Sequence, residues 1–445
     1  MNNAEKYVQQ LLELAKSEGA TAADAIYVGS TDLTVGYRNG AQETLERSES
    51  SGIGLRVWHG AKIASVSTDD MSNDSLQALA ARAVAMAKVA TEDTYNFLAD
   101  KSVYYDSKNI DLQLADIFEP DAKYLQKTAK QMEDIALQQK GVTNSEGVES
   151  SYGKSHFMLA TSEGFVGSSV DTSYSMSVSL IAGEGDKMET DYDHAVARFA
   201  ADLPTPQSVG LKAAENVLKR LNPRKKSTCQ VPIILDPRIS RSLVSCFASG
   251  INGAAIVRGT SFLKDFMGKK VFADGVKIID NPLIVRGLAS QPFDAEGVPC
   301  KRLTLVEDGI LQSWLLDLRS AKKLGAKTTA HASRGLGSNP SPSATNFYME
   351  AGIISPMEMI ADIKDGFYVT ETFGMGINLI TGDYSQGASG FWIENGEIAY
   401  PVSELTIAGH LRDMFINLTP ANDLVFRYGK NAPTLRIDGM TIAGN

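Results

Sequence analysis

The sequence has few of the residues from which disulfide and metal sites are built. Its 445 residues include 3 cysteines and 5 histidines. Cys229, Cys246 and Cys300 lie far apart and form no Cys-x-x-Cys pair, which excludes a disulfide framework and a cysteine-rich zinc module. This usage is typical of a protein of the reducing cytoplasm. Cys246 lies in an apolar helical pattern, where we expect a small buried side chain.

Long hydrophobic runs and an excess of positive charge are also missing. No run of about 18 apolar residues is present, so no membrane span is predicted. The first residues lack the basic and apolar regions of a signal peptide. The 43 lysines and arginines are outnumbered by 53 acidic residues, and the net charge is −10. Because such a surface repels phosphate backbones, we expect a cytoplasmic protein that binds neither membranes nor nucleic acids.

The common catalytic motifs are absent. Zinc hydrolases carry His-Glu-x-x-His or His-Glu-x-x-x-His, which places both imidazoles on one helix face. No two histidines here lie within a helical turn of each other, and there is no Gly-x-Ser-x-Gly elbow of a serine hydrolase. The stretch from Gly147 to Ser155 is one residue too long for a phosphate-binding loop. The residues alone therefore indicate no catalytic set.

The hydrophobic patterns predict an α+β fold in which antiparallel sheets are combined with segregated helices. Apolar residues at helical spacing predict helices over 3–18, 73–89, 120–139, 206–221, 237–250, 355–364 and 409–417. Strands are predicted on both sides of a turn near Ser30, and along 142–182. There Tyr174, Met176 and Val178 alternate with serines, a pattern typical of a strand with one solvated face.

A basic, proline-flanked stretch, NPRKKSTCQVP, predicts a domain boundary. We expect an N-terminal α+β domain over residues 1–222 and a C-terminal, mostly β domain over 223–445. The second domain contains two predicted hairpins, one around Asp308-Gly309 and one closed by Asn395-Gly396.

Three polar stretches of the chain could carry a site. The stretch TGDYSQGAS is either part of a structural core with tight turns or a loop at the rim of a cleft, and it offers candidates for a peptide groove or an interface: Gly382, Asp383, Tyr384 and Ser385. His331 precedes the loop RGLGSNPSPSATN, which is either mobile or pinned by a partner. This histidine could contact a ligand or make a structural hydrogen bond.

The third polar stretch, 183–194, contains five carboxylates and one histidine. Asp191, Asp193 and His194 are possible metal ligands, although their spacing fits no calcium loop. A solvated acidic loop is the simpler interpretation.

Several long stretches resemble one protein family. ITGDYSQGASGFWIENGEIAYPVSELTIAG, GLASQPFDAEGVPCKRLTLVEDGILQSWLLD, AIVRGTSFL and VTNSEG are similar to the TldD/PmbA family, and most similar to its PmbA branch, also called TldE. The resemblance covers nearly the whole chain. It implies a cytoplasmic, two-domain α+β protein whose pairs form a heterodimeric metalloprotease. Such pairs cut unfolded peptides, mature a microcin precursor and degrade a labile antitoxin, and older names call them modulators of DNA gyrase.

The sequence departs from the catalytic TldD branch of that family. That branch carries His-Glu-x-x-x-His before a Gly-Thr-Ser turn, and its three functional positions fall on Val244, Ser245 and Ser249. These side chains cannot bind zinc tetrahedrally or take a proton from its water. The TldD branch also uses a cysteine near its C-terminus, and the matching stretch after Asp423 has none. The resemblance thus implies no catalytic residue, metal or cofactor in this chain, and zinc in the partner subunit.

Three hypotheses follow from these observations. The first is a non-catalytic subunit that pairs with a TldD-type paralogue and holds an unfolded peptide. The second is a homodimer that binds peptides or regulates without proteolysis. The third is an independent hydrolase built on His331, Asp383 and Ser385, although nothing in the sequence brings these three residues together.

Overall fold

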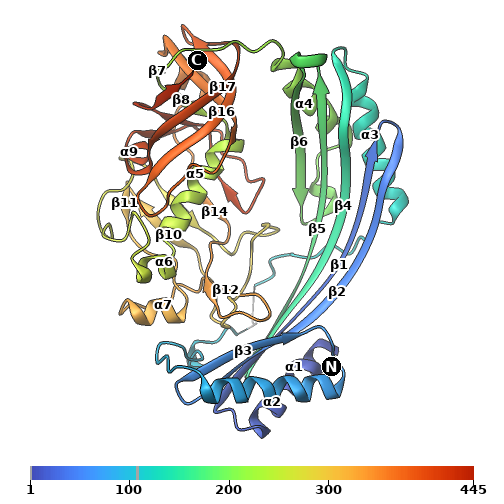
Figure 1. The fold of residues 1–445 in the computed structure, drawn as a ribbon, viewed down its shortest axis with the longest axis vertical. Coiled ribbons are helices and arrows are strands. Elements are labelled where there is room, and N and C mark those ends of the chain that lie inside the picture. The colour runs from blue at the N-terminus through green and yellow to red at the C-terminus, as the bar shows by residue number, and fades with distance from the viewer. Residues whose placement is uncertain (1–2, 107–109, 445) are drawn as a thin grey trace.

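The computed structural model describes residues 3–106 and 110–444. Residues 1–2, 107–109 and 445 lie outside the described residues. The fold is α+β with mostly antiparallel sheets, as the sequence predicts. Figure 1 shows two halves side by side, with the long strands of the N-terminal half along one side.

The N-terminal half contains a six-stranded antiparallel sheet in the order β3-β2-β1-β4-β5-β6. In Figure 1 β1, β2, β4 and β5 run along most of the height of the molecule. The strands are β1 (Ala22–Arg38), β2 (Ala41–His59), β3 (Lys62–Thr68), β4 (Val142–Thr161), β5 (Val166–Ala182) and β6 (Glu189–Ala197).

The predicted turn near Ser30 is wrong, because β1 continues through it. Ser30 is paired with Ser50 of β2 on one side and with Ser155 of β4 on the other. The hydroxyl oxygens of Ser30 and Ser50 also lie 2.9 Å apart. A polar run resembles a turn in sequence, but strands on both sides satisfy its backbone groups and keep it extended.

Helices cover both ends of this sheet, and the predicted helices of this half are confirmed. α1 and α2 pack on β1, β2 and β3, whereas α3 and α4 pack on β4, β5 and β6. Ser72 caps α2, since its side chain accepts a hydrogen bond from the N–H of Ser75. The α-helices are α1 (Asn3–Ser17), α2 (Asn73–Val89), α3 (Ala122–Leu137) and α4 (Pro206–Lys219), and short 3-10 helices span Lys101–Val103, Gly185–Lys187 and Ala200–Asp202.

The acidic stretch 183–194 is not the solvated loop that its composition suggests. From Glu189 onward it forms β6, the edge strand of the sheet. Asp191 is only 6% exposed. In β5, by contrast, the predicted alternation is confirmed: Tyr174, Met176 and Val178 are buried, and the serines between them are partly exposed.

The C-terminal half combines an eight-stranded sheet in the order β18-β20-β8-β15-β16-β17-β21-β7 with a five-stranded sheet, β11-β10-β9-β14-β19, and the pair β12-β13. The strands are β7 (Cys229–Gln230), β8 (Ile233–Leu235), β9 (Ile278–Asp280), β10 (Leu303–Glu307), β11 (Ile310–Leu311), β12 (Ala332–Ser333), β13 (Ser341–Pro342), β14 (Phe347–Met349), β15 (Asp365–Phe373), β16 (Asp383–Glu394), β17 (Glu397–His410), β18 (Leu418–Pro420), β19 (Lys430–Asn431), β20 (Leu435–Ile437) and β21 (Thr441–Ala443).

Helix α5 lies against the core of this half. Its buried face includes Leu243, Val244 and Phe247, and the Phe247 ring packs edge-on against Phe272 and Phe415. The helices are α5 (Pro237–Gly250), α6 (Gly253–Arg258), α7 (Leu318–Lys323), α8 (Pro356–Ile360) and α9 (Leu411–Ile416). Within the described ranges, every helix is too short or too polar to cross a lipid bilayer.

The Ser/Pro-rich loop after His331 is pinned by the N-terminal half of the same chain. Arg334 forms an ion pair with Asp24 at 2.6 Å, and the two side chains are 2% and 1% exposed. Leu336 lies so close to β2 that a Cβ at Gly54 would be 2.0 Å from its carbonyl oxygen. The loop therefore fastens the two halves together.

Candidate functional site

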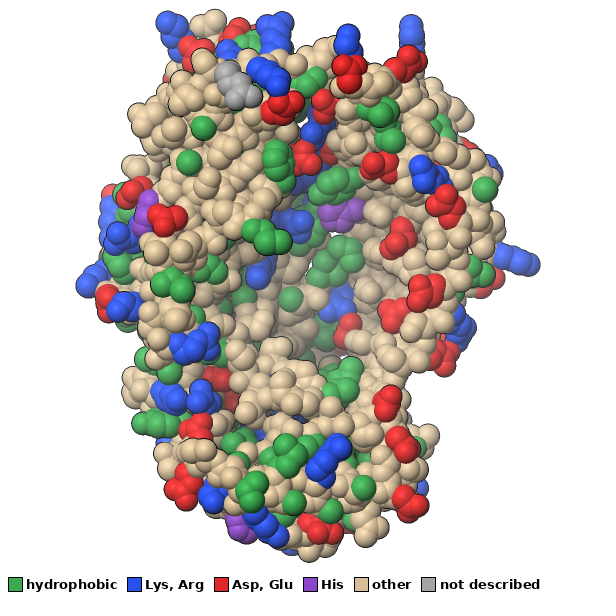
Figure 2. Space-filling model, viewed as in Figure 1, with side chains coloured by type: hydrophobic (Ala, Val, Ile, Leu, Met, Phe, Trp, Pro, Cys, Tyr) green, Lys and Arg blue, Asp and Glu red, His purple; other side chains and the backbone are tan. Residues whose placement is uncertain are grey.

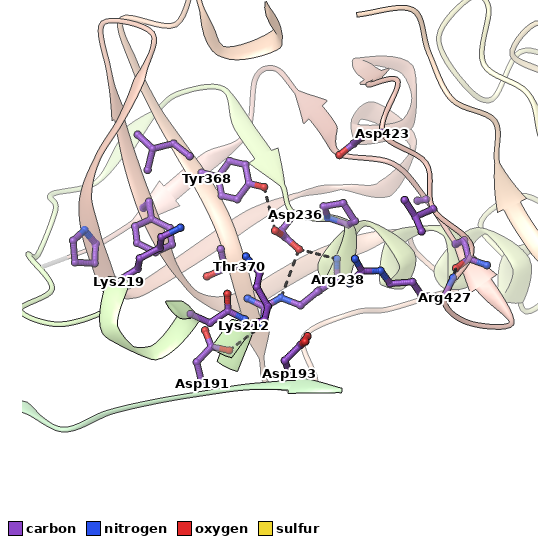
Figure 3. A pocket seen from close by; sticks show the side chains of 18 of the residues that line it. Asp191, Asp193, Lys212, Lys219, Asp236, Arg238, Tyr368, Thr370, Asp423 and Arg427 are labelled. Carbon is purple, nitrogen blue, oxygen red and sulfur yellow. Dashed lines mark hydrogen bonds and ion pairs between the residues drawn. The ribbon is translucent and has the colours of Figure 1, made fainter. Parts of the chain in front are cut away.

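A cavity of about 840 Å³ lies between the two halves. Figure 2 shows a hollow here with basic and hydrophobic side chains inside it, and Figure 3 shows the labelled residues close by. The lining comes from β6 (Asp191, Asp193), α4 (Lys212, Asn216, Lys219), the start of α5 (Asp236, Pro237, Arg238), β15 (Tyr368, Thr370), the β16–β17 hairpin (Phe391, Ile398, Ala399, Tyr400, Pro401) and the segment 423–432 (Asp423, Val425, Arg427, Tyr428, Asn431, Ala432).

Arg238 links the two sides of this cavity. One of its terminal nitrogens (Nη1) lies 2.9 Å from Asp191 of β6, and its Nε lies 3.6 Å from Asp236 (Figure 3). Asp236 caps α5 by accepting from the N–H of Arg238, and it also accepts from the hydroxyl of Tyr368 at 3.1 Å. Burial lowers the pKa of Arg238, but the charges of Asp191 and Asp236 outweigh it, so the net shift of this pKa is upward.

A second contact between the halves lies next to Arg238. Arg220, just after α4, pairs with Glu371 of β15 at 2.6 Å and lies 3.7 Å from Asp191. Asp191 therefore faces two arginines, which explains how a carboxylate on an edge strand can be buried. Sequence analysis named Asp191 as a possible metal ligand, whereas the structure uses it in ion pairs.

His194 of β6 forms an aromatic contact with Tyr428, a residue that lines the cavity. Their ring centroids are 5.2 Å apart, and the guanidinium carbon of Arg241 lies 4.1 Å from the Tyr428 centroid. Burial and the positive charges of Arg241, Arg238 and Arg427 lower the pKa of His194. Burial raises the pKa of Asp193, although nearby arginines oppose this shift.

The three positions at which a TldD-type helix would bind zinc lie on α5 and do not fit the metal. Val244 is 1% exposed and packs in the hydrophobic core. The hydroxyl groups of Ser245 and Ser249 donate to the carbonyl oxygens of Arg241 and Ser245, at 2.9 and 3.0 Å. Two small hydroxyl groups bonded to their own helix and one buried valine offer no nitrogen, thiolate or carboxylate ligand.

Other possible metal ligands do not gather elsewhere in the described part of the chain. Among residues 3–106 and 110–444, no group of three or more His, Cys, Asp and Glu residues is placed to bind a metal ion. Burial raises the pKa of the Cys246 thiol to about 11, and this cysteine packs against the core, as predicted.

The stretch TGDYSQGAS is mostly strand, not a loop at the rim. Asp383 is paired with His410 and Ser385 with Ala408 in the β16–β17 ladder, and Tyr384 is 3% exposed. Exposed Asp383 and Ser385 alternate with buried Tyr384 and Gln386, and the glycines allow neighbouring strands to approach closely. A run that resembles a flexible loop in sequence is therefore a closely packed strand. Gly382 and the three residues that follow it are not among the residues that line the described cavity.

His331 is a buried residue with its own partners. Its Nδ1 lies 2.9 Å from the hydroxyl of Thr329, and its Nε2 lies 3.2 Å from a carboxylate oxygen of Asp280. Asp383 instead accepts a hydrogen bond from Thr381 at 2.5 Å. His331 and Asp383 thus have different partners, and among the residues that the structure describes no hydrogen bond or ion pair joins them into a hydrolase site.

Sequence analysis missed a pair of buried acids, Asp294 and Glu296. Burial raises the pKa of Asp294 to about 6 and raises that of Glu296 well above its usual range. Asp294 lines a smaller cavity of about 300 Å³ together with Arg334. In the sequence these two acids belong to the motif DAEG, within the family-like stretch GLASQPFDAEGVPCKRLTLVEDGILQSWLLD, and no local pattern marks them as buried.

The architecture of the chain matches solved structures. A crystal structure from Bacteroides thetaiotaomicron, named as a modulator of DNA gyrase, has a TM-score of 0.92, 27% sequence identity and 100% coverage of both chains. TldE from Thermococcus kodakarensis has a TM-score of 0.85 over 98% of this chain and 100% of that chain. At 18% identity, this second likeness is one of fold alone. The class of protein is therefore defined by this two-half α+β fold, which the chain shares with both structures.

Family models and curated relatives specify the family. The models of PmbA/TldA metallopeptidase domain 1, central domain and C-terminal domain match residues 23–87, 115–221 and 228–444. Metalloprotease PmbA of Escherichia coli O157:H7 is 37% identical over 99% of this chain and 96% of its own length. The Haemophilus influenzae homolog is 37% identical over 98% and 94%. The chain belongs to the PmbA/TldD family of metallopeptidases, as the sequence motifs indicated.

Proposed function

We propose that this chain is the non-catalytic subunit of a heterodimeric metallopeptidase, in which a TldD-type paralogue carries the zinc. The observation that supports this proposal most is on helix α5, where Val244, Ser245 and Ser249 occupy the three positions of the zinc motif. Val244 packs in the core, and both serines donate hydrogen bonds to carbonyl oxygens of their own helix. No proton-transfer or metal-binding step can be assigned to these side chains.

The segment in which the TldD branch carries its cysteine supports the same proposal. The stretch in which the TldD branch has its cysteine follows Asp423, and residues 423–432 line the cavity together with the start of α5. The two segments that carry ligands in a catalytic relative therefore both border this cavity. Here they contribute Arg238, Arg427 and Tyr428 together with Asp236 and Asp423. The two aspartates accept hydrogen bonds from Tyr368 and Thr434, and the arginines suit the binding of a substrate rather than of a metal cation.

The substrate in this proposal is an unfolded peptide, such as a microcin precursor or a labile antitoxin, in the cytoplasm. An added strand on the free edge of β6 is disfavoured, because Asp191 and Asp193 each accept a hydrogen bond from the N–H of the next residue. Side chains that block an edge strand reduce pairing with another chain. The peptide is therefore expected to be bound by side chains of the cavity.

The test is metal content and peptidase activity, measured on this chain alone, on the zinc-bearing paralogue alone and on their mixture. We expect no stoichiometric zinc and no cleavage of a disordered peptide by this chain, and cleavage by the mixture that a chelator abolishes. Cleavage by this chain alone that a chelator blocks would refute the proposal.

Association has to be measured in the same samples. We expect a one-to-one complex with the paralogue by size-exclusion chromatography with mass determination. If the chain prefers to associate with itself and does not change the paralogue's activity, a homodimeric peptide-binding or regulatory protein would be the better description.

A further inference from the structure

Two further arginines lie at or beside this cavity: Arg427 is part of its lining, and its charge acts on Asp193, whereas Arg241 stacks on the lining residue Tyr428. Arg238 is neutralised by Asp191 and Asp236. Arg241, on α5, and Arg427, in the segment 423–432, have no carboxylate at ion-pair distance in residues 3–106 and 110–444. A guanidinium group that lines a concave site can bind a carboxylate ligand through its paired N–H donors.

The guanidinium group of Arg241 is held in a fixed orientation. It stacks on Tyr428 at 4.1 Å from the ring centroid, and its Nε donates to the carbonyl oxygen of Arg238 at 3.2 Å. Both Nη nitrogens are left to donate hydrogen bonds from a plane that the tyrosine defines. An arginine that is oriented before binding loses less entropy when it forms such bonds.

Three arginine charges act on one region of the cavity. Arg241, Arg238 and Arg427 all lower the pKa of His194. The ring of this histidine contacts the ring of Tyr428 at a tilt. Because burial also favours the neutral imidazole, His194 does not repel a cationic neighbour. The charges of Arg241, Arg427 and Asp193 all act on Tyr428, so two cations and one carboxylate lie near its ring.

We propose that Arg241, Arg427 and Tyr428 form a carboxylate-binding subsite for the bound peptide. The ligand is either the C-terminal α-carboxylate or an aspartate or glutamate side chain. A planar carboxylate matches the paired donors of a guanidinium group. A dianion such as phosphate is disfavoured, because the lining also includes Asp191, Asp193, Asp236 and Asp423. This subsite rests on the proposed function, since it assumes that a peptide enters the cavity.

The apolar lining suits the remainder of such a peptide. Phe391, Ile398, Val425 and Ala432 line the cavity beside the charged residues. A peptide whose carboxylate meets Arg241 and Arg427 can place an apolar side chain against this part of the wall. The subsite thus predicts a preference for an acidic group beside a hydrophobic residue.

The test uses one fluorescein-labelled, unstructured peptide in three versions: a free C-terminal carboxylate, a C-terminal amide, and the amide with one internal glutamine replaced by glutamate. Binding is measured by fluorescence anisotropy on this chain, alone and mixed with the metal-depleted paralogue. We expect the free acid, the glutamate peptide or both to bind about tenfold more tightly than the neutral amide, as charge-assisted hydrogen bonds typically allow. The acidic version that gains affinity identifies which carboxylate is bound.

Variants assign the effect to the cluster. Arg427→Gln and the double variant with Arg241→Gln should abolish the preference for the acidic peptide over the amide. Arg302→Gln is the matched control, because Arg302 is exposed and pairs with Glu350 away from the cavity. The side chain of Arg427 is exposed and has no ion-pair partner among the described residues, so its substitution remains informative if the double variant folds poorly.

Two further outcomes overturn the subsite. Equal affinity for all three peptides, or an unchanged preference in Arg427→Gln, would refute it while leaving the proposed function intact. Failure of every version to bind, with or without the paralogue, would refute the proposed function together with the subsite.

Discussion

Gly382, just before β16, has a backbone that other residues rarely adopt. Its φ is +95°, and a Cβ here would lie 2.7 Å from two atoms of the His410 ring. That ring cannot easily move, because its Nε2 lies 2.9 Å from the carbonyl oxygen of Thr381 and its Nδ1 accepts from the N–H of Arg412. Conformation and contact thus both require glycine at this position.

We therefore expect Gly382→Ala to lower the free energy of unfolding by about 1–2 kcal/mol, the usual cost of a left-handed backbone for a residue with a Cβ. The measurement is chemical denaturation. Gly335→Ala is the control, because the nearest atom to a Cβ there is the Ser338 hydroxyl oxygen at 3.6 Å. Equal stability of the Gly382 variant and the wild type would show that the strand start tolerates a side chain.

Substitution of His331 tests whether this residue has a structural or a catalytic role. The side chain is 1% exposed and lies between Thr329 and Asp280. His331→Ala removes these contacts from the interior, so we expect a loss of about 1–3 kcal/mol of stability. The peptidase activity of the mixture with the paralogue should be unchanged per folded molecule. A fully folded variant that lost this activity would support the independent hydrolase instead.

Helix α5 contributes to the core and to the wall of the cavity at the same time. Asp236 and Pro237 begin the helix, and Leu243, Val244 and Phe247 bury one face of it in the core. The opposite face presents Arg238 and Arg241 toward the cavity region, where they contact Asp191 and Tyr428. The helix therefore still shapes the site, although its ligand positions now hold a core residue and two serines.

We predict that Val244→His, Ser245→Glu and Ser249→His together do not create a tight zinc site. An imidazole at position 244 would enter the core, where an unpaired polar group is unfavourable, and no cysteine follows Asp423. Competition with a chelator of known affinity measures the result, and the matched control is the wild-type chain. Zinc binding as tight as that of the paralogue would contradict this prediction.

The two halves of the molecule are joined by a buried network of charges. Asp24 of β1 pairs with Arg56 of β2 and with Arg334 of the Ser/Pro-rich loop, and all three side chains are at most 2% exposed. Burial raises the pKa of Asp24, but Arg334 and Arg56 outweigh it and the net shift is downward. The loop also packs on β2, where Leu336 lies close to Gly54. These contacts hold the two halves in place on either side of the cavity.

Asp24→Asn leaves two buried arginines without their shared carboxylate, so we expect a loss of about 3–5 kcal/mol of stability at neutral pH. Asp362→Asn, which breaks an exposed pair with Arg436, should cost at most about 1 kcal/mol. Because the folded pKa of Asp24 lies below its ordinary value of 3.8, its contribution is complete above that pH and declines as the pH falls further. Denaturation curves of both variants and the wild type at neutral and acidic pH measure these losses of stability. If Asp24→Asn lost as much stability at acidic pH as at neutral pH, the predicted pH dependence would be wrong.

The local sequence determined most of the elements of this protein. Apolar spacing and capping residues located α2, α3, α4 and α5, and turn residues located the hairpins at Asp308 and Asn395, because these features depend on neighbours a few residues away. The long motifs indicated the family, and the residues at positions 244, 245 and 249 already argued against a zinc site.

Only the tertiary structure decided what the polar stretches do. The middle of β1 and TGDYSQGAS are strands because partners distant in sequence bond their backbones. Asp191 is an ion-pair residue because Arg220 and Arg238 reach it from separate elements. The cluster of Arg241, Arg427 and Tyr428 is assembled from segments almost two hundred residues apart. Such long-range contacts leave no periodic signal in the sequence, since they are set by how sheets and halves pack rather than by local propensity.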